Sequence, residues 1–175
     1  MVMARDWGRI ITRLFRHRWM DDADLARAVP PAMVERLGQR VGASERRHSG
    51  EIRMYVEAGL PASYILRDAP PRERALAIFG KLRVWDTEHN NGVLIYLLLA
   101  EHAIEIVADR GLAARVDPGE WQRIVERMRG AFQAGRFEDG LTQALEEVSA
   151  LLVAHFPLAP GAASPNELPD EPVLG

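Results

Sequence analysis

The segment that most constrains the fold is an apolar run near the middle of the chain, residues 93–100. It reads Val-Leu-Ile-Tyr-Leu-Leu-Leu-Ala, without a charge and without alternation of apolar and polar residues. This length is typical of a strand, and β-branched and aliphatic residues without alternation indicate a strand covered on both faces. Such a strand needs helices packed on each side of its sheet. A membrane span would need about 18 or more apolar residues, so the run is too short to cross a bilayer.

The segments around this run predict the rest of the sheet. Residues 52–57 alternate between apolar and polar side chains, which is typical of a half-buried strand. A helix opening at Pro70-Pro71 lies between that strand and the apolar run, so the two strands should be parallel with a right-handed crossover. Glu101-His102 is a candidate two-residue turn into a third, antiparallel strand over 104–108. Helices are further expected at about 22–28, 31–47, 62–67, 118–134 and 137–155. We therefore predict an α/β three-layer α/β/α sandwich with a small mixed sheet, preceded by an N-terminal amphipathic helix.

The composition supports one domain with two distinct ends. A chain of 175 residues with 47% hydrophobic residues can bury one core, and the absence of cysteine excludes disulfides, thiolate metal sites and a cysteine nucleophile. Residues 1–20 carry five arginines against one aspartate, and a domain of mildly acidic charge is expected over 21–156. Residues 157–175 hold three acidic residues, no basic residue and five prolines, which predicts a disordered acidic tail. The net charge of −3 argues against a nucleic-acid partner.

The first twenty residues predict a basic amphipathic helix. One face would carry Trp7, Ile10, Ile11, Leu14, Phe15 and Trp19, and the opposite face Arg5, Arg9, Arg13 and Arg16. Two interpretations stay open. The helix either docks on the domain with its arginines in solvent, or attaches to anionic lipid or to a partner's groove. In the second interpretation the contact residues are Trp7, Arg9, Arg13, Arg16 and Trp19.

The location of the protein is also an expectation from these residues. The arginines recur every three or four residues, so no apolar stretch of signal-peptide length follows the start of the chain. We therefore expect a cytoplasmic protein, held at the periphery of a membrane if the helix binds lipid.

The densest polar cluster is the loop before the apolar run, and it is the main candidate for chemistry. Asp86, Glu88, Asn90 and Asn91 offer hard oxygen ligands, which suit Ca²⁺ or Mg²⁺. The spacing does not match an EF-hand, because Asn91 and Leu97 stand where glycine and glutamate are needed. The alternative interpretation is a turn in which Asn-Asn-Gly permits positive φ angles.

A second polar cluster, Asp109-Arg110-Gly111, follows the third predicted strand. Antiparallel pairing of the last two strands places it beside the polar loop. Asp109 would join the metal ligands and Arg110 would bind an anionic group such as a phosphate. The alternative is an internal Asp–Arg pair that pins the loop.

The remaining polar residues are weaker candidates. The segment His48-Ser49-Gly50-Glu51 is predicted to be a turn between a helix and a strand. The positions of His17, His102 and His155 favour surface residues.

Three motifs resemble those of the TPM domain family. They are Trp85-Asp86-Thr87-Glu88-His89-Asn90-Asn91-Gly92-Val93-Leu94-Ile95-Tyr96, then Glu105-Ile106-Val107-Ala108-Asp109-Arg110-Gly111-Leu112, then Phe132-x-x-Gly135-x-Phe137-x-x-Gly140. The resemblance covers about residues 35–156 and is greatest to the short bacterial branch without a membrane helix. It implies an α/β/α sandwich, a divalent-cation site, phosphatase activity at the loop end of the sheet, and a LemA-type membrane protein as partner. Asn90 and Val107 stand where longer members carry acidic residues.

These observations lead to two functional hypotheses. The favoured one is a binding module that docks near a membrane or a membrane-protein partner through the basic helix. The alternative is a divalent-metal-assisted phosphatase with Asp86, Asp109 and Arg110 as catalytic residues and Asp86, Glu88, Asn90, Asn91 and Asp109 as metal ligands.

Overall fold

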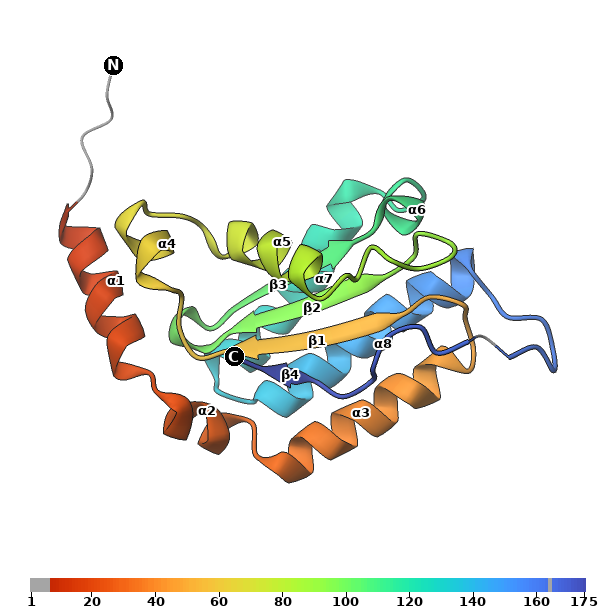
Figure 1. Cartoon of the computed structure of the whole chain (residues 1–175), viewed down its shortest axis with the longest axis horizontal. Coiled ribbons are helices and arrows are strands. Elements are labelled where there is room, and N and C mark those ends of the chain that lie inside the picture. The colour runs from red at the N-terminus through yellow and green to blue at the C-terminus, as the bar shows by residue number, and fades with distance from the viewer. Residues whose placement is uncertain (1–6, 164) are drawn as a thin grey trace, which may run out of the picture.

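The computed structural model describes residues 7–163 and 165–175, and its centre is a four-stranded sheet (Figure 1). The strands are β1 Ile52–Glu57, β2 Val93–Leu98, β3 Ala103–Ala108 and β4 Val173–Leu174, in the order β3-β2-β1-β4. β1 and β2 are parallel, with Ile52 opposite Val93, whereas β2 and β3 are antiparallel. Both relations confirm the prediction. Every residue of β2 is buried, as the unbroken apolar run requires.

Helices cover both faces of this sheet in the described residues. They are α1 Trp7–Trp19, α2 Asp22–Ala28, α3 Pro31–Glu45, α4 Ala62–Leu66, α5 Pro71–Lys81, α6 Arg110–Ala113, α7 Pro118–Gln133 and α8 Phe137–His155, with the 3-10 helix η1 at Leu99–Glu101. Proline opens α3, α5 and α7, where its missing N–H leaves no intrahelical bond unmade. The predicted α/β/α sandwich with a small mixed sheet and an N-terminal helix is confirmed.

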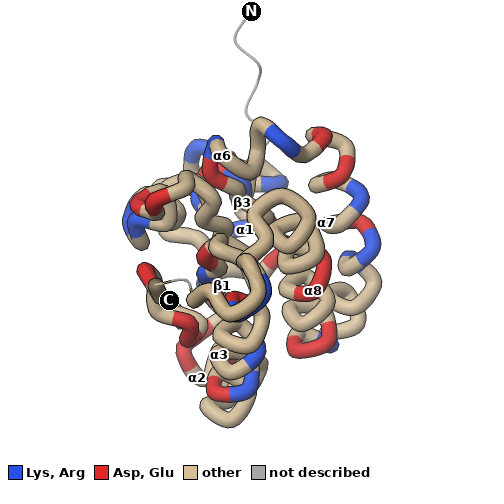
Figure 2. The backbone as a smooth tube through the Cα atoms, turned by 90° about the vertical axis from the view of Figure 1, so that its right-hand side faces the viewer, with Lys and Arg blue, Asp and Glu red and all other residues tan. Residues whose placement is uncertain are grey.

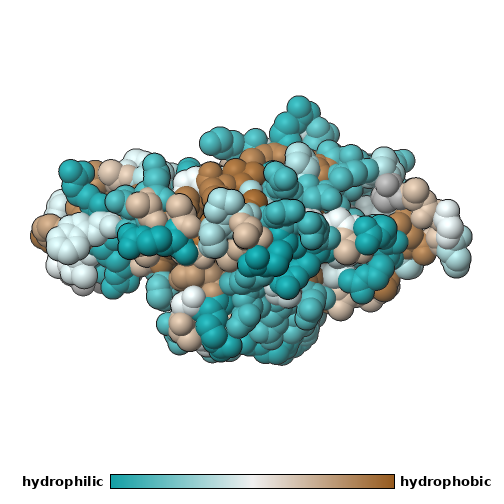
Figure 3. Space-filling model, turned by 90° about the horizontal axis from the view of Figure 1, so that it is seen from below, coloured by the Kyte–Doolittle hydropathy of each residue, from teal (hydrophilic) through white to brown (hydrophobic). Residues whose placement is uncertain are grey.

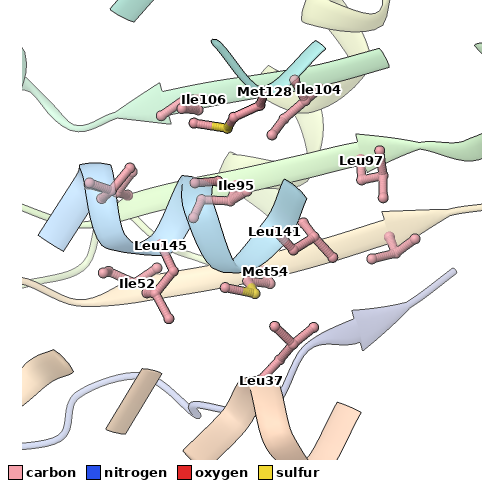
Figure 4. Close-up of a cluster of buried hydrophobic side chains, with 14 of the residues drawn as sticks. Leu37, Ile52, Met54, Ile95, Leu97, Ile104, Ile106, Met128, Leu141 and Leu145 are labelled. Carbon is pink, nitrogen blue, oxygen red and sulfur yellow. The ribbon is translucent and has the colours of Figure 1, made fainter. Parts of the chain in front are cut away.

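Two separate cores lie on the two faces of the sheet. Alternate side chains of β1 and β2, such as Met54 and Ile95, pack with Leu37 of α3, Met128 of α7 and Leu141 of α8 (Figure 4). The intervening residues of the same strands face α4 and α5 and form the second, smaller cluster. Because side chains alternate along a strand, six residues of β2 supply both cores at once.

The structure corrects the prediction of a disordered tail. Of residues 157–175, the last described segment forms β4, which lies parallel to β1 with Val173 opposite Tyr55. Leu168 is buried, and its N–H donates to the carboxylate of Glu51 at 3.0 Å. The physical reason is the edge of β1, whose N–H and C=O groups need partners. The proline-rich composition of the tail contains no information about this unpaired strand edge.

The turn between β2 and β3 also differs from the prediction. Glu101 and His102 do not form a two-residue hairpin loop. The chain passes through η1, and His102 then takes a left-handed conformation with φ of 48°. The pair lacks the Asn-Gly that a tight turn of this kind favours, and the longer connection avoids that need.

Candidate functional site

The N-terminal helix α1 is attached to the domain by a mixed side, on which Arg13 and His17 lie beside the apolar Ile10 and Leu14. Arg13, only 12% exposed, bridges two carboxylates: its Nε donates to Glu101 Oε1 at 2.8 Å and its Nη1 to Asp68 Oδ1 at 2.9 Å. Its remaining nitrogen donates to the carbonyl of Ala69 at 3.0 Å. Arg9 forms an additional ion pair with Asp68. A guanidinium with all three nitrogens engaged fixes the rotation of the helix about its axis.

His17, one turn further along α1, completes this attachment. Its Nδ1 accepts the backbone N–H of Leu60 at 2.9 Å, so its Nε2 carries the proton and donates to Glu101 Oε1 at 2.8 Å. Burial raises the pKa of Glu101, but the hydrogen bonds from His17 and Arg13 outweigh burial and leave that pKa below its ordinary value. The expectation that His17 is a surface residue is wrong, since it is 5% exposed.

The apolar residues of the same helix divide between two sides: Ile10 is buried and Leu14 packs against the second core, whereas the other four face outward. Trp7, Ile11, Phe15 and Trp19 follow one another at intervals of four residues and are 58%, 50%, 61% and 78% exposed. We call these four residues the aromatic ridge. Between α1 and α4, a groove of about 530 Å³ borders it, lined by Ile11, Phe15, Leu60 and Ile65 among others. In the view from below, pale and brown residues alternate with teal at the left end, where α1 lies in Figure 1 (Figure 3).

This orientation settles part of the question that the sequence left open. α1 does dock on the domain, but Arg13 is buried in that contact and Arg9 is ion-paired, so these arginines are not simply solvated. Arg16 and Arg18 are exposed, and neither makes an ion pair within the described residues. Elsewhere along the chain, acidic and basic residues are interspersed (Figure 2). The predicted segment 1–20 begins with residues 1–6, which lie outside the described residues.

The polar loop at the other end of the sheet is ordered by its own side chains. Asn91 is fully buried; its N–H donates to Thr87 Oγ1 at 3.1 Å and its Nδ2 to Ser49 Oγ at 3.3 Å. Asn90 has a φ of 52°, a left-handed conformation that asparagine tolerates better than most residues. The loop is therefore the turn that the alternative interpretation described.

Asp109, Arg110 and Gly111 lie beside this loop, as the antiparallel pairing predicts. The N–H of Gly111 donates to the carbonyl of Asn90 at 2.8 Å, and Arg110 Nη2 donates to Asn90 Oδ1 at 2.7 Å. A Cβ on Gly111 would come within 2.5 Å of the carbonyl oxygen of Asn90, so the loop and α6 meet here without room for a side chain. Arg110 pairs with Asn90, and the expected Asp109–Arg110 ion pair is not formed.

The candidate metal ligands are not all brought together. Asp86 pairs with Arg83 at 2.6 Å, and the backbone N–H of Glu88 donates to Glu167 of the C-terminal segment at 3.0 Å. Among the described residues, no three histidine or acidic side chains are arranged to hold a metal ion. Asp109 differs: Oδ1 caps the N–H of Arg110, whereas Oδ2 is buried without a hydrogen-bond partner. In this cluster Asp109 Oδ2 is thus the unpartnered oxygen, whereas Asn90 Oδ1 accepts from Arg110 and Asn91 Oδ1 lies 3.4 Å from Thr87 Oγ1.

A buried ionic cluster that sequence reasoning missed lies beneath α5. Both oxygens of Glu57 accept Arg74 Nε at 3.0 Å, and Tyr96 donates its hydroxyl to Glu57 at 2.7 Å. Burial raises the pKa of Tyr96, and the neighbouring carboxylate raises it further. The cluster is satisfied within itself and enclosed by the second core, so we assign it to the fold. No local pattern signals it, because its members are 17 and 22 residues apart.

Two further buried groups have strongly shifted pKa values. Burial raises the pKa of Glu45 to about 8, although its carboxylate accepts the N–H of Ile52. Burial lowers the pKa of His48 to about 4. His48 Nδ1 donates to the carbonyl of Gly50 at 3.0 Å, and Ser44 lies 2.9 Å from its Nε2. Since both side chains are buried, this serine–histidine contact has no access to a substrate.

The comparisons with known proteins agree with this fold. A three-layer α/β/α domain with a mixed sheet defines the structural class. Residues 23–151 match the family described as TPM domain, and the chain belongs to that family. The fold is similar to the BA42 protein from the psychrophilic bacterium Bizionia argentinensis, with a TM-score of 0.72, 24% identity, and coverage of 84% of this chain and 95% of that one. It is also similar to the N-terminal domain of a protein from P. gingivalis, with a TM-score of 0.54, 19% identity, and coverage of 82% and 96%. A comparison with curated proteins finds no match.

None of the helices in the described residues combines the length and the apolar character that a membrane span requires.

Proposed function

We propose that this TPM-domain protein is an interaction module that docks on an anionic membrane surface through the aromatic ridge of α1. The observation that carries the proposal is the orientation of α1: Arg13 and His17 face the domain, and Trp7, Ile11, Phe15 and Trp19 face outward. Ile10 and Leu14 already supply the apolar contact of α1 with the domain, so the exposed ridge is a separate apolar patch, and such patches mark contacts outside the molecule.

The chemistry of the ridge favours a lipid surface. Tryptophan lies at both ends of the ridge, and indole rings prefer the headgroup level of a bilayer. The exposed Arg16 and Arg18 belong to the same helix, and an arginine near an anionic surface contributes about 1 kcal/mol. An amphipathic helix lying in the interface plane combines these two contributions. Attachment should therefore be reversible and sensitive to salt. The LemA-type membrane protein that the family resemblance implies is the competing partner for the same ridge.

Vesicle co-sedimentation tests the proposal with a matched pair of tryptophan variants. The wild-type protein should pellet with vesicles of phosphatidylserine and phosphatidylcholine, and less with phosphatidylcholine alone. Trp19→Ser should reduce pelleting severalfold, whereas Trp85→Ser, which removes a half-exposed tryptophan at the opposite end of the domain, should not. Equal loss in both variants, or no preference for anionic vesicles, would refute lipid docking. Binding of a LemA-type protein that Trp19→Ser abolishes, without vesicle binding, would assign the ridge to that partner.

The second candidate function is a divalent-metal-assisted phosphatase at the loop end of the sheet. What supports it is the unpartnered Oδ2 of Asp109, with Arg110 as the adjacent cation for a phosphate oxygen. Asp109, Asn90 and Asn91 would hold the ion, and a bound ion would polarise the phosphoryl group. For this to happen, Asn90 Oδ1 would have to release Arg110, and Asp86, if it joined the site, would have to release Arg83.

Thermal shift with Ca²⁺ and Mg²⁺ tests this second candidate. A ligand that binds the native state alone raises the melting temperature. The shift should be present in wild type and in Asp86→Asn, and lost in Asp109→Asn. Hydrolysis of p-nitrophenyl phosphate should require the ion and Arg110. No shift at millimolar ion would exclude this mechanism.

A further inference from the structure

The strand β3 is an open edge of the sheet. Strand order places β3 outermost on one side, whereas the other side is closed by β4. β4 is itself an added strand: it pairs with β1 over two residues, and the N–H of Gly175 donates to the carbonyl of Val56 at 3.0 Å. The sheet thus accepts an extended segment on one edge, and the opposite edge has no strand in the described part of the chain.

Two hydrogen bonds show which backbone groups point outward from β3. The N–H of Asp109 donates to the carbonyl of Gly92 at 2.8 Å, so the backbone N–H and C=O groups of the odd-numbered residues of this strand point toward β2. Arg72 donates to the carbonyl of Ile106, so the backbone N–H and C=O groups of the even-numbered residues point away from β2, toward the open edge. Because these groups alternate along a strand, Ile104, Ile106 and Ala108 each present an N–H and a C=O to the open edge. In the described residues, Arg72 is the one side chain bonded to them.

A groove of about 660 Å³ runs along this edge. The α7 side of the groove includes Val116, Trp121 and Val125, together with the polar Gln122, Glu126 and Arg129. On the α5 side lie Arg72 and Glu105, 3.5 Å apart. The groove therefore offers backbone hydrogen-bond partners along β3 and apolar contacts from Trp121 and Val125 on its α7 side.

These features specify an extended chain rather than another kind of occupant. Only an extended backbone supplies alternating donors and acceptors at the spacing of about two residues that the edge demands. A second copy of the domain would have to bring its own α5 and α7 beside the helices that flank this edge, whereas an extended segment brings no helices.

We infer that β3 is a peptide-docking edge that binds an extended segment of a partner protein by strand addition, with apolar residues at alternate positions facing Trp121 and Val125. The incoming N–H replaces Arg72 at the carbonyl of Ile106, and Arg72 keeps Glu105 as its partner. Until then Arg72 caps the edge, which is one way in which folded proteins limit unspecific strand pairing. The inference goes beyond lipid docking and uses none of the residues of α1.

Amide NMR tests the inference with a defined probe, the peptide acetyl-Ser-Val-Thr-Val-Thr-Val-Ser-amide. Millimolar peptide should shift the amide signals of Ile104, Ile106 and Ala108 and slow their hydrogen exchange at least tenfold. The matched control is the same peptide with its valine nitrogens methylated, which keeps the side chains and removes backbone donors. Equal binding of the two peptides, or signal changes confined to other residues, would overturn the inference. Protection that grows with protein concentration in the absence of peptide would also overturn it, in favour of pairing between copies.

Two variants should change the peptide affinity in opposite directions. Ala108→Pro removes an outward donor and spares the bonds to β2, so it should weaken binding about fivefold, the equivalent of one hydrogen bond. Arg72→Ala removes the competing donor and should strengthen binding severalfold. If Ala108→Pro does not fold, the Arg72→Ala variant and the methylated peptide decide the matter. If Arg72→Ala binds the peptide with unchanged affinity, and the wild-type protein binds it at another site, the inference that β3 is the docking edge is wrong. Trp19→Ser should bind the peptide as wild type does, which separates this result from lipid docking.

Discussion

Truncation of Arg13 should release α1 from the domain while leaving the core intact. Arg13→Ala removes the group that links Glu101, Asp68 and the carbonyl of Ala69. Breaking a buried ion pair costs about 3–5 kcal/mol. The partners here are 12–23% exposed, and Arg9 and His17 still contact the same two carboxylates, which reduces the loss to roughly 3 kcal/mol or less. A free-energy change of that size corresponds to about a 100-fold increase in local opening.

Hydrogen exchange resolved by residue measures this opening. Amides of α1 should exchange up to about 100-fold faster in Arg13→Ala, and amides of β2 should keep their wild-type rates. Arg16→Ala is the matched control, because it truncates the same side chain one turn further along the helix, where the arginine is exposed. It should change exchange less than threefold. Similar acceleration in both variants, or equal acceleration in β2, would refute the view that the ion pairs of Arg13 hold α1 on the domain.

Three further predictions concern stability. Native Glu45, with its pKa of about 8, keeps a proton that the unfolded chain releases near pH 4.5, so this group's contribution to the free energy of unfolding should fall as the pH rises from about 4.5 to 8; urea titrations should show this slope in wild type and little of it in Glu45→Gln. Gly111→Ala should destabilise the fold by about 2 kcal/mol or more and displace the polar loop, because its Cβ would collide with carbonyl oxygens; an unchanged melting temperature would contradict the packing. Gly130→Ala, inside α7 with open space around its Cβ, should instead stabilise the protein by about 0.5–1 kcal/mol in the same assay.

The parts of the fold that the sequence predicted rest on local pattern. The unbroken run at 93–100 requires a strand buried on both faces, and the helix between it and strand 52–57 requires a parallel pair. Asp109 and Gly92 could be placed at one end of the sheet by the same logic, and their backbone hydrogen bond confirms it. These inferences succeed because side-chain periodicity and connection length are properties of short segments.

The geometry of the candidate site could not be predicted in the same way, because it depends on contacts between distant segments. Asp86 and Glu88 satisfy the residue types of a cation site, yet Arg83 and Glu167 contact them, and only the folded chain brings Glu167 to that loop. The Glu57–Arg74–Tyr96 cluster is equally invisible in sequence, because each member looks like an ordinary residue of its own element.

The sequence by itself determined that α1 is amphipathic, that the central strand is buried, and that the loop and the segment after β3 lie together. Tertiary structure decided which side of α1 faces the domain. Hydrophobicity alone would turn the whole apolar side inward. Only Ile10 and Leu14 are packed there, because Asp68 and Glu101, brought together from separate segments, bind Arg13 on that same side and leave the aromatic ridge exposed. Tertiary structure also decided the conformation of the C-terminal segment, since the open edge of β1 pairs with residues whose composition predicts disorder. In both cases the deciding partner lies far away in the sequence, so no local pattern contains it.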